Sequence, residues 1–358
     1  MNNKKLSPIK DIIKDAKNGK IFILVDDKNR ENEGDLVIPA SKCNYKKINF
    51  MAMHGRGLVC LALTKRQVDK LSLPLMSSVN KARMQTAFTV SIEAKKGITT
   101  GISAFDRAKT IKVAINKNSK KKDIVSPGHV FPLVAKNGGV LERAGHTEAS
   151  VDISKLAKLD PSAVICEVMN EDGRMARFDD LLKFSKKHNL KIGSIEDLIS
   201  YRLKNEKLIT NTHNKFVLLQ RFGEFELKSF RNKLDNTVSY ALVKGEINFR
   251  KNVRVRVISK TITSKAISLN KNYIKKSLKY LNKYNSFALI VIRNQNNNSE
   301  KDTTKQNINN NILRYYGIGA QIIKELKIKN MILVSRSKKK IIGLDGYGIK
   351  IKKQEIIK

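Results

Sequence analysis

The sequence predicts two consecutive domains of the α/β (α+β) class, the first a mixed sheet covered by helices and the second another α/β unit. Short apolar runs alternate with helix-like segments along the 358 residues. All six prolines lie at or before Pro161, so the two halves differ in composition. Because a polar stretch separates them, we predict a first domain over residues 1–204, a linker over 205–215 and a second domain over 216–358.

Five short apolar runs in the first half are typical of buried strands, namely residues 21–25, 57–63, 88–94, 129–135 and 163–169. Two further segments begin like helices. Ser103 and Ser194 are each followed three positions later by an aspartate, which is an N-terminal capping pattern. We therefore expect helices over residues 103–116 and 194–203.

The second half repeats the alternation. Strands are expected over residues 238–247, 253–259, 287–293 and 330–336, and helices over 272–284 and 318–328. Between Arg293 and Asn311 the sequence is polar and rich in asparagine. Such a composition cannot bury a core, so a mobile loop is expected there.

No apolar run approaches the roughly 20 residues that a membrane helix needs. The N-terminus has basic residues but lacks an uninterrupted apolar stretch and a small-residue cleavage site. The three cysteines, Cys43, Cys60 and Cys166, are too few and too scattered for a disulfide framework or a cysteine-based zinc site. We therefore expect a cytoplasmic protein with no membrane partner.

The formal net charge is +39, of which residues 1–200 carry +14 and residues 201–358 carry +25. Charge of this sign attracts polyanions and speeds the capture of phosphorylated substrates. The lysines are dispersed rather than striped along one element, which is typical of a solvated surface. We therefore expect no nucleic-acid partner, although a basic nucleic-acid-binding module remains an alternative.

Carboxylates crowd the segment that follows the first predicted strand. Within ten residues the sequence places Asp26, Asp27, Glu31, Glu33 and Asp35. Arg30 lies among them, and Gly34 permits a sharp turn. Carboxylates crowded at a strand end are unfavourable unless a cation or acid–base chemistry uses them. The alternative is a solvated acidic turn.

A second group of polar residues lies farther along the first half. Arg143 can fork onto a phosphate, His146 can bind a metal or move protons, and Thr147 can help form an anion site at a helix start. His129 precedes a strand, and Glu167 lies inside an apolar one, where an unpaired carboxylate is costly. Together with the acidic loop, this set suits enolisation and rearrangement of a sugar phosphate.

Several long motifs, taken in order, carry a resemblance to a known family. They are DDKNRENEGDLVIPA, HGRGLVCLAL, TAFTVSIEAKKGITTGISAFDRAKT, SPGHVFPLVAKNGGVLERAGHTEASVD and VICEVMNEDGRMAR. From about residue 8 to residue 203 the chain closely resembles 3,4-dihydroxy-2-butanone 4-phosphate synthase. The resemblance implies a lyase of riboflavin biosynthesis that converts D-ribulose 5-phosphate to 3,4-dihydroxy-2-butanone 4-phosphate and formate.

The resemblance also implies roles for individual residues. Glu31 would ligate two Mg²⁺ (or Mn²⁺) ions, and His146 would complete the site on one of them. The substrate would be held by Arg30, Glu31, Asp35, Arg143, Ala144, Gly145, His146 and Thr147, with Arg143 and Thr147 toward its phosphate. Essential catalytic roles are implied for His129 and Glu167 and a proton-transfer or supporting role for Glu33, while Cys60 is expected near the site.

The implied reaction begins with removal of a C1 proton to give an enediol. Loss of water, a skeletal shift and hydrolytic release of C4 as formate follow. The resemblance further implies a homodimer with its site near the subunit interface, so that His129 would serve the neighbouring chain's site.

The second half resembles GTP cyclohydrolase II over roughly residues 215–358. The matching segments are RFGEFE, YALVKGEI, VRVRVIS, RYYGIGAQIIKELKIKNMILVS and GLDGYGIK. In that family three cysteines after the VRVRV strand hold zinc, whereas this chain has no cysteine after Cys166. Ile312 stands where the family has an acid, and Ser335, Arg336 and Ser337 replace a threonine and paired asparagines.

We therefore predict a degenerate, catalytically inactive second domain without zinc, retained for scaffolding, dimer support or regulation. The alternative of a bifunctional enzyme predicts bound zinc and formate release from GTP. A basic nucleic-acid-binding module instead predicts salt-sensitive RNA binding without turnover of the sugar phosphate.

Overall fold

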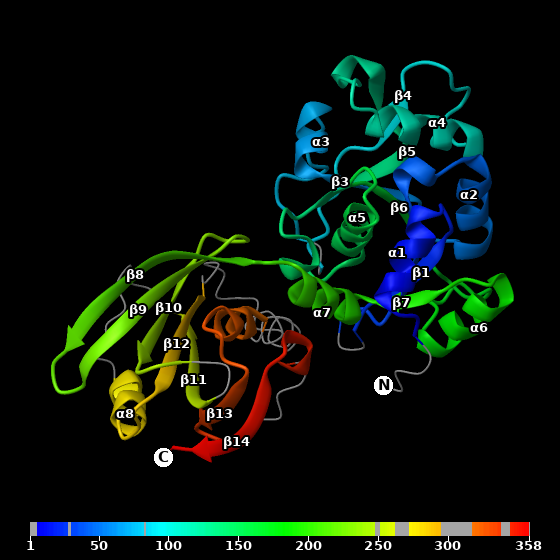
Figure 1. The fold of residues 1–358 in the computed structure, drawn as a ribbon. Coiled ribbons are helices and arrows are strands. Elements are labelled where there is room, and N and C mark those ends of the chain that lie inside the picture. The colour runs from blue at the N-terminus through cyan, green and yellow to red at the C-terminus, as the bar shows by residue number, and fades with distance from the viewer. Residues whose placement is uncertain are drawn as a thin grey trace. The chain divides into compact units, whose positions relative to one another are not determined.

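A computed structural model describes residues 6–27, 30–81, 84–247, 251–261, 272–294, 317–337 and 344–357. The chain divides into two compact units, Met1–Ile199 and Ser200–Lys358 (Figure 1), which we call the first and second units.

The described residues of the first unit form a seven-stranded sheet. In the order β4-β5-β3-β6-β2-β1-β7, its strands are β4 (Ile92–Ala94), β5 (Ile124–Ala135), β3 (Cys60–Thr64), β6 (Ala163–Glu167), β2 (Gly34–Pro39), β1 (Phe22–Val25) and β7 (Ile192–Ser194). The β3–β5 and β1–β7 pairs are parallel and the other neighbours antiparallel. The predicted mixed sheet is confirmed.

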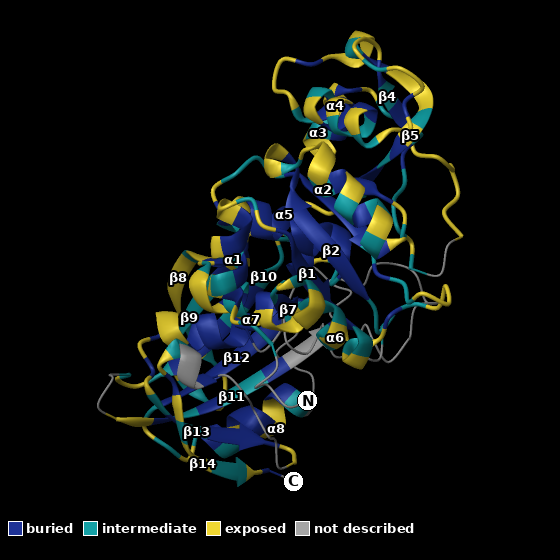
Figure 2. Cartoon of the chain, turned by 90° about the vertical axis from the view of Figure 1, so that its right-hand side faces the viewer, coloured by how far each residue is buried: buried dark blue, intermediate teal, exposed yellow. Residues whose placement is uncertain are grey.

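Helices cover this sheet. They are α1 (Ile9–Lys17), α2 (Tyr45–Phe50), α3 (Lys65–Lys70), α4 (Ala104–Ile115), α5 (His146–Leu156), α6 (Phe178–His188) and α7 (Ile195–Asn205). Helix α5 packs against β2, β3, β5 and β6, and α4 packs against α2, β4 and β5. Because α5 is covered on all sides, its residues from His146 to Ser154 are buried, and Figure 2 shows α5, β1 and β2 largely in the colour of buried residues.

Both predicted capping serines start helices. The Ser103 hydroxyl accepts a hydrogen bond from the Asp106 amide at 3.0 Å, and α4 begins at the next residue. The Ser194 hydroxyl accepts from the Asp197 amide at 3.0 Å, and α7 begins at Ile195. In both cases the hydroxyl satisfies an amide that has no partner within the helix.

The described residues of the second unit also form a seven-stranded mixed sheet. In the order β14-β13-β11-β12-β10-β9-β8, its strands are β14 (Lys350–Ile356), β13 (Asn330–Ser335), β11 (Asn252–Thr261), β12 (Phe287–Asn294), β10 (Val238–Lys244), β9 (Gly223–Asn232) and β8 (Ile209–Leu219). Helix α8 (Asn272–Leu281) and a helix over 317–325 accompany it. Within the described residues, no helix has the length and apolar character needed to span a bilayer.

Several strands were not foreseen, namely β2, β7, β8, β9 and β14. The predicted linker, residues 205–215, needs correction because β8 begins at Ile209 and pairs with β9 from there to Leu219. Strand β8 is mostly exposed on both faces, so it lacks the apolar alternation that marks a strand. Most of the predicted mobile loop lies outside the described residues.

The core of the first unit offers a direct stability test at Leu36, which is fully buried and lies between Ile23 and Cys166 on the neighbouring strands. We expect Leu36→Ala to lower the free energy of unfolding by about 2–5 kcal/mol, since it removes buried methyl groups and leaves a cavity. Urea unfolding followed by circular dichroism measures this loss. The control Met53→Ala, at a side chain 58% exposed, should change stability by less than about 0.5 kcal/mol, and equal losses in both would contradict the placement of Leu36.

Candidate active site

The loop that joins β1 to β2 is organised by the buried carboxylate of Asp26. It accepts hydrogen bonds from the backbone amides of Glu31 and Glu33, at 3.1 and 2.9 Å. It also accepts from Nη1 of Arg30 at 2.8 Å, and the same nitrogen lies 2.6 Å from Oε2 of Glu31. Asp26 therefore folds the acidic loop and fixes Arg30 and Glu31 beside it.

Strand pairing adds two more carboxylates. Asp35 on β2 lies directly opposite Glu167 at the end of β6. Burial, followed by the neighbouring carboxylates of Glu167 and Glu31, raises the pKa of Asp35 well above its usual range. Burial and Glu31 likewise raise the pKa of Glu33, against the opposing effect of Arg177. Both shifts reflect burial together with the negative charge of the neighbouring carboxylates.

His146 reaches this group from the first residue of α5. Its Nδ1 lies 4.0 Å from Oε2 of Glu31 and 3.8 Å from Oδ1 of Asp35. Burial lowers the pKa of His146 to about 4, although the Asp26 carboxylate opposes the shift, so the ring is neutral at neutral pH. Its buried Nε2 has no hydrogen-bond partner in the part of the chain that the structure describes.

Asp26, Glu31 and His146 form a candidate metal site. Each offers one ligand atom, and these atoms lie within 4.8 Å of one another. Carboxylate oxygens suit hard divalent cations, and a neutral imidazole with an unpartnered nitrogen is the form that binds a metal. The raised pKa values of Asp35 and Glu33 also favour a cation at this place, because its positive charge would relieve the repulsion among the carboxylates. The residues therefore fit Mg²⁺ or Mn²⁺.

The same end of α5 is a candidate anion site. Gly145 is the N-cap of α5, so the backbone amides of His146 and Thr147 belong to the first helical turn, where amides lack helical partners. Beside them, Nη1 of Arg143 lies 2.6 Å from Oε2 of Glu148. A guanidinium held next to free amides suits a phosphate.

Arg143 is fixed by two further contacts. Its Nη2 donates to the Met84 carbonyl at 2.9 Å and to the Thr86 hydroxyl at 3.1 Å. A Cβ at Gly145 would overlap the Arg143 guanidinium and lie 2.9 Å from Oε2 of Glu148. Glycine is therefore needed at position 145 for the arginine to lie against the start of the helix.

Glu167 is held by the segment that leads into β3. The Leu58 amide donates to Oε2 of Glu167 at 2.8 Å. Burial raises the pKa of Glu167, although this hydrogen bond opposes the shift. A Cβ at Gly57 would lie 2.7 Å from the Glu167 backbone nitrogen, so only glycine permits this approach. Glu167 is a candidate proton donor or acceptor because its environment weakens its acidity.

His129 lies on β5, and its Nδ1 is hydrogen-bonded to the Glu93 carboxylate. Its side chain is 44% exposed. None of its interactions with other described residues reaches Asp26, Glu31 or His146. Within this chain, the structure thus brings together the predicted acidic loop, Arg143, His146, Thr147 and Glu167, but not His129.

Two buried thiols lie beside the acidic group. Burial raises the pKa of both Cys60 and Cys166, and the nearby carboxylate of Glu167 raises it further. The pKa of Cys166 is raised to about 12. Cys60 lies opposite Ile165, and Ile165 directly precedes Cys166 in the chain. Both are therefore protonated at neutral pH, and the expectation that Cys60 lies near the site agrees with this arrangement.

Three residues contribute to the candidate site in ways that the sequence alone does not predict. Asp26 was noted in the acidic run but not assigned to the metal. Arg177 donates to the carbonyls of Glu31 and Asn32, at 2.6 and 2.9 Å, and Glu148 pairs with Arg143. Arg177 and Glu148 lie within the motifs that carried the resemblance, yet their partners are visible only once the chain is folded.

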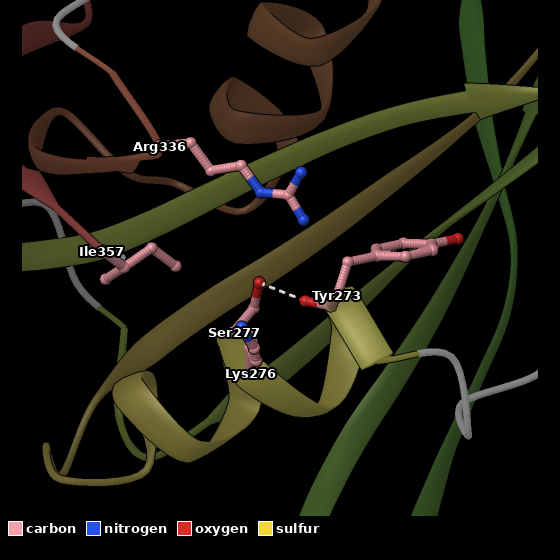
Figure 3. A pocket seen from close by; sticks show the side chains of 5 residues that line it. All are labelled: Tyr273, Lys276, Ser277, Arg336 and Ile357. Atoms are coloured by element: carbon pink, nitrogen blue, oxygen red, sulfur yellow. Dashed lines mark hydrogen bonds between the residues drawn. The ribbon is translucent and has the colours of Figure 1, made fainter.

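The second unit has a separate cavity of about 380 Å³. It is lined by Tyr273, Lys276, Ser277, Arg336 and Ile357. Figure 3 shows the Arg336 guanidinium extending over α8, where the Ser277 hydroxyl donates to the Tyr273 carbonyl at 2.8 Å. The lining contains no cysteine, histidine or carboxylate among the described residues, so it offers no zinc ligands.

Comparison with known proteins agrees with the division of the chain into two units. Residues 10–201 match the family model of 3,4-dihydroxy-2-butanone 4-phosphate synthase, and residues 210–356 match that of GTP cyclohydrolase II. The riboflavin biosynthesis protein RibBA of Aquifex aeolicus is 42% identical over 99% of this chain and 93% of its own length.

Two solved structures are similar as well. One is RibBX, a two-domain 3,4-dihydroxy-2-butanone 4-phosphate synthase from A. baumannii, with a TM-score of 0.81 and 39% identity over 98% of this chain and 99% of its own. The other is a 3,4-dihydroxy-2-butanone 4-phosphate synthase in complex with two magnesium ions, with a TM-score of 0.53 and 39% identity over 56% of this chain and 98% of its own. The chain therefore belongs to the 3,4-dihydroxy-2-butanone 4-phosphate synthase family.

Proposed function

We propose that the first unit converts D-ribulose 5-phosphate to 3,4-dihydroxy-2-butanone 4-phosphate and formate. The observation that carries this proposal is the Asp26–Glu31–His146 group beside the start of α5. A cation site next to a phosphate site matches a substrate that has hydroxyl and carbonyl oxygens at one end and a phosphate at the other.

The contacts support a role for each group. Arg143 and the amides of His146 and Thr147 hold the phosphate, while Arg30 and Asp35 hold the sugar oxygens. Magnesium, when bound by Glu31 and His146 with Asp26 as a further ligand, supplies Lewis-acid polarisation of the substrate oxygens. A related synthase holds two magnesium ions, and two per site are proposed here.

Glu33 and Glu167 carry out the proton transfers. Burial raises the pKa of both, which brings them closer to the neutral range where a carboxyl group can both give and take a proton. Their environments differ, because Glu167 is held by the Leu58 amide whereas Glu33 faces Arg177 at 3.6 Å. Removal of the C1 proton and hydration at C4 can therefore use different groups.

His129 is proposed to act in the site of a second copy of the chain. Its side chain is exposed on β5 and makes no contact with the acidic group of its own chain among the described residues. A homodimer that places β5 of one subunit at the site of the other would complete the catalytic set.

The second unit is proposed to lack GTP cyclohydrolase activity. The chain has no cysteine after Cys166, so the thiolates implied for the family's zinc are missing. The cavity at α8 offers Lys276 and Arg336 but no metal ligand among its described residues. We propose that this unit supports the dimer or its regulation.

An assay of the purified chain tests both proposals. With magnesium, formate should form from ribulose 5-phosphate. With magnesium and zinc, no formate should form from GTP. Formate from GTP would refute the proposed loss of the second activity, and none from the sugar phosphate would refute the synthase.

Removal of the metal should stop the reaction without unfolding the chain. Treatment with a chelator should reduce formate release to background, and added magnesium should restore it, while circular dichroism stays unchanged. Undiminished turnover after exhaustive chelation would exclude a metal-dependent reaction.

Substitutions at the metal site should abolish turnover with the fold intact. Glu31→Gln and His146→Ala each remove a ligand, and we expect kcat to fall at least about a hundredfold. Asp26→Asn should weaken magnesium activation as well, since Asp26 both folds the loop and lies among the ligand atoms.

Matched controls lie in the second unit, where Glu224 and His213 are exposed. Glu224→Gln and His213→Ala should leave kcat unchanged. Near-normal rates in Glu31→Gln or His146→Ala would show that the assigned ligands are wrong.

A further inference from the structure

A cavity of about 230 Å³ lies against α6 in the first unit. One wall is a single face of that helix, because its lining residues recur three or four positions apart. The other wall comes from residues 54–56 and from the segment that follows β6. The helix contributes Asp180, Lys183, Phe184, Lys187 and His188. The described lining includes none of the candidate metal ligands and not Arg143, so the cavity is distinct from the candidate active site.

The wall opposite α6 contains a strained residue, Arg56. A π-helical turn over Met51–Gly55 ends there, and Arg56 has a φ of +67°. A residue with a Cβ adopts this left-handed conformation only at a cost in free energy. Backbone contacts hold it, since Arg56 bridges to Val168 and the Gly55 carbonyl accepts from the Met169 amide at 2.9 Å. The fold thus maintains an unfavourable backbone at a residue whose side chain lines the cavity.

Four further hydrogen-bond donors of the lining are uncommitted. Lys183 and Lys187 lie one turn apart on α6, and neither forms an ion pair or hydrogen bond within the described part of the chain. The rings of His54 and His188 contact each other, with centroids 4.7 Å apart, but their nitrogens make no hydrogen bond to a described residue. Burial, followed by the charges of His54 and Lys187, lowers the pKa of His188.

The two carboxylates of the lining do little to neutralise these positive charges. Asp180 already accepts hydrogen bonds from the Arg177 amide at 3.0 Å and from the Asn170 side-chain amide at 3.3 Å. Glu171 is 83% exposed, and its carboxylate lies 3.7 Å from Nη2 of Arg56. An exposed pair at that distance contributes little in water. The cavity therefore offers more donors than acceptors.

Both walls continue into residues of the candidate active site. Two positions after Arg56, the Leu58 amide donates to the Glu167 carboxylate. At the other wall, Arg177 directly precedes α6 and donates to the Glu31 carbonyl at 2.6 Å. A ligand that contacts both walls would therefore act on the segments that hold Glu167 and the acidic loop.

We propose that this cavity is a regulatory site for a small polyanion, namely a phosphate ester or a polycarboxylate with several charged oxygens. Arg56, Lys183 and Lys187 offset the charge of the ligand, and the imidazole N–H groups of His54 and His188 donate to its oxygens. The volume is below the roughly 300–1,000 Å³ that is typical of sites for drug-sized molecules, so the ligand is small.

Nitrogen-15 spectra of the histidine side chains test binding to the full chain. Pyrophosphate and citrate are titrated separately in the absence of magnesium. The chain has five histidines, and His54→Gln and His188→Gln assign the two signals of interest. These two signals should shift, while that of the exposed His213 stays in place. A response to one probe alone assigns its chemical class, a response to both supports the shared chemistry, and no response to either overturns the proposal.

A double substitution on α6 separates the cavity from the overall charge of the chain. Lys183→Gln with Lys187→Gln should weaken binding about tenfold or more, because both charges face the ligand. The matched control is Lys186→Gln with Lys112→Gln, which removes the same charge at exposed residues outside the lining. The control pair should bind as tightly as the unmodified chain. Equal affinities in the two double variants would overturn the proposal.

Kinetics test the regulatory role, and this part rests on the proposed function. At constant free magnesium, a saturating probe should change kcat at least about twofold in the unmodified chain but not in the Lys183→Gln, Lys187→Gln variant. Competition at Arg143 would instead raise KM equally in both proteins. An unchanged kcat, or an equal change in both, would overturn the regulatory role. Absence of formate from the unmodified chain would refute the proposed function, and the spectra would still decide whether the cavity binds the anion.

Discussion

Electrostatic repulsion among the carboxylates of Asp26, Glu31, Glu33, Asp35 and Glu167 is the constraint on which the first unit depends. Strand pairing places Asp35 opposite Glu167, and the short β1–β2 connection brings the other three to the same strand ends. Burial raises the cost of this arrangement. Arg30, Arg177 and several backbone amides offset it only in part, and a neutral His146 lies at its edge. The fold thus gathers negative charge at one place, which is the physical basis of the proposed cation site.

The sequence predicted those parts of the fold in which local pattern and tertiary burial agree. Apolar runs became β1, β3 and β6, and the capping serines started α4 and α7. The β8–β9 hairpin was missed because β8 is largely exposed, so nothing in its pattern separates it from a polar linker. Strand β14 carries lysines and lies at the edge of its sheet, where packing demands little of its side chains.

The candidate site was predictable where its members are neighbours in sequence. The acidic loop and the turn from Arg143 to Thr147 each occupy one short stretch, so residue type and spacing were informative. Glu93, Arg177 and the Leu58 amide make hydrogen bonds to partners that are distant in sequence. These contacts depend on strand register and on glycines that allow close approach, which one sequence does not reveal. The second unit shows the converse, because its scaffold is recognisable although the cysteines implied for its chemistry are missing.

The protonated state of the thiols has a practical consequence. Oxidants and alkylating reagents attack the thiolate, and burial raises the pKa of Cys43 and Cys166 to about 12 and that of Cys60 as well. All three are free, and Cys60 and Cys166 are also shielded from solvent. The folded chain should therefore tolerate air and storage without a reducing agent. Thiol labelling becomes a sensitive reporter of unfolding, because Cys60 and Cys166 react only when the sheet that buries them opens.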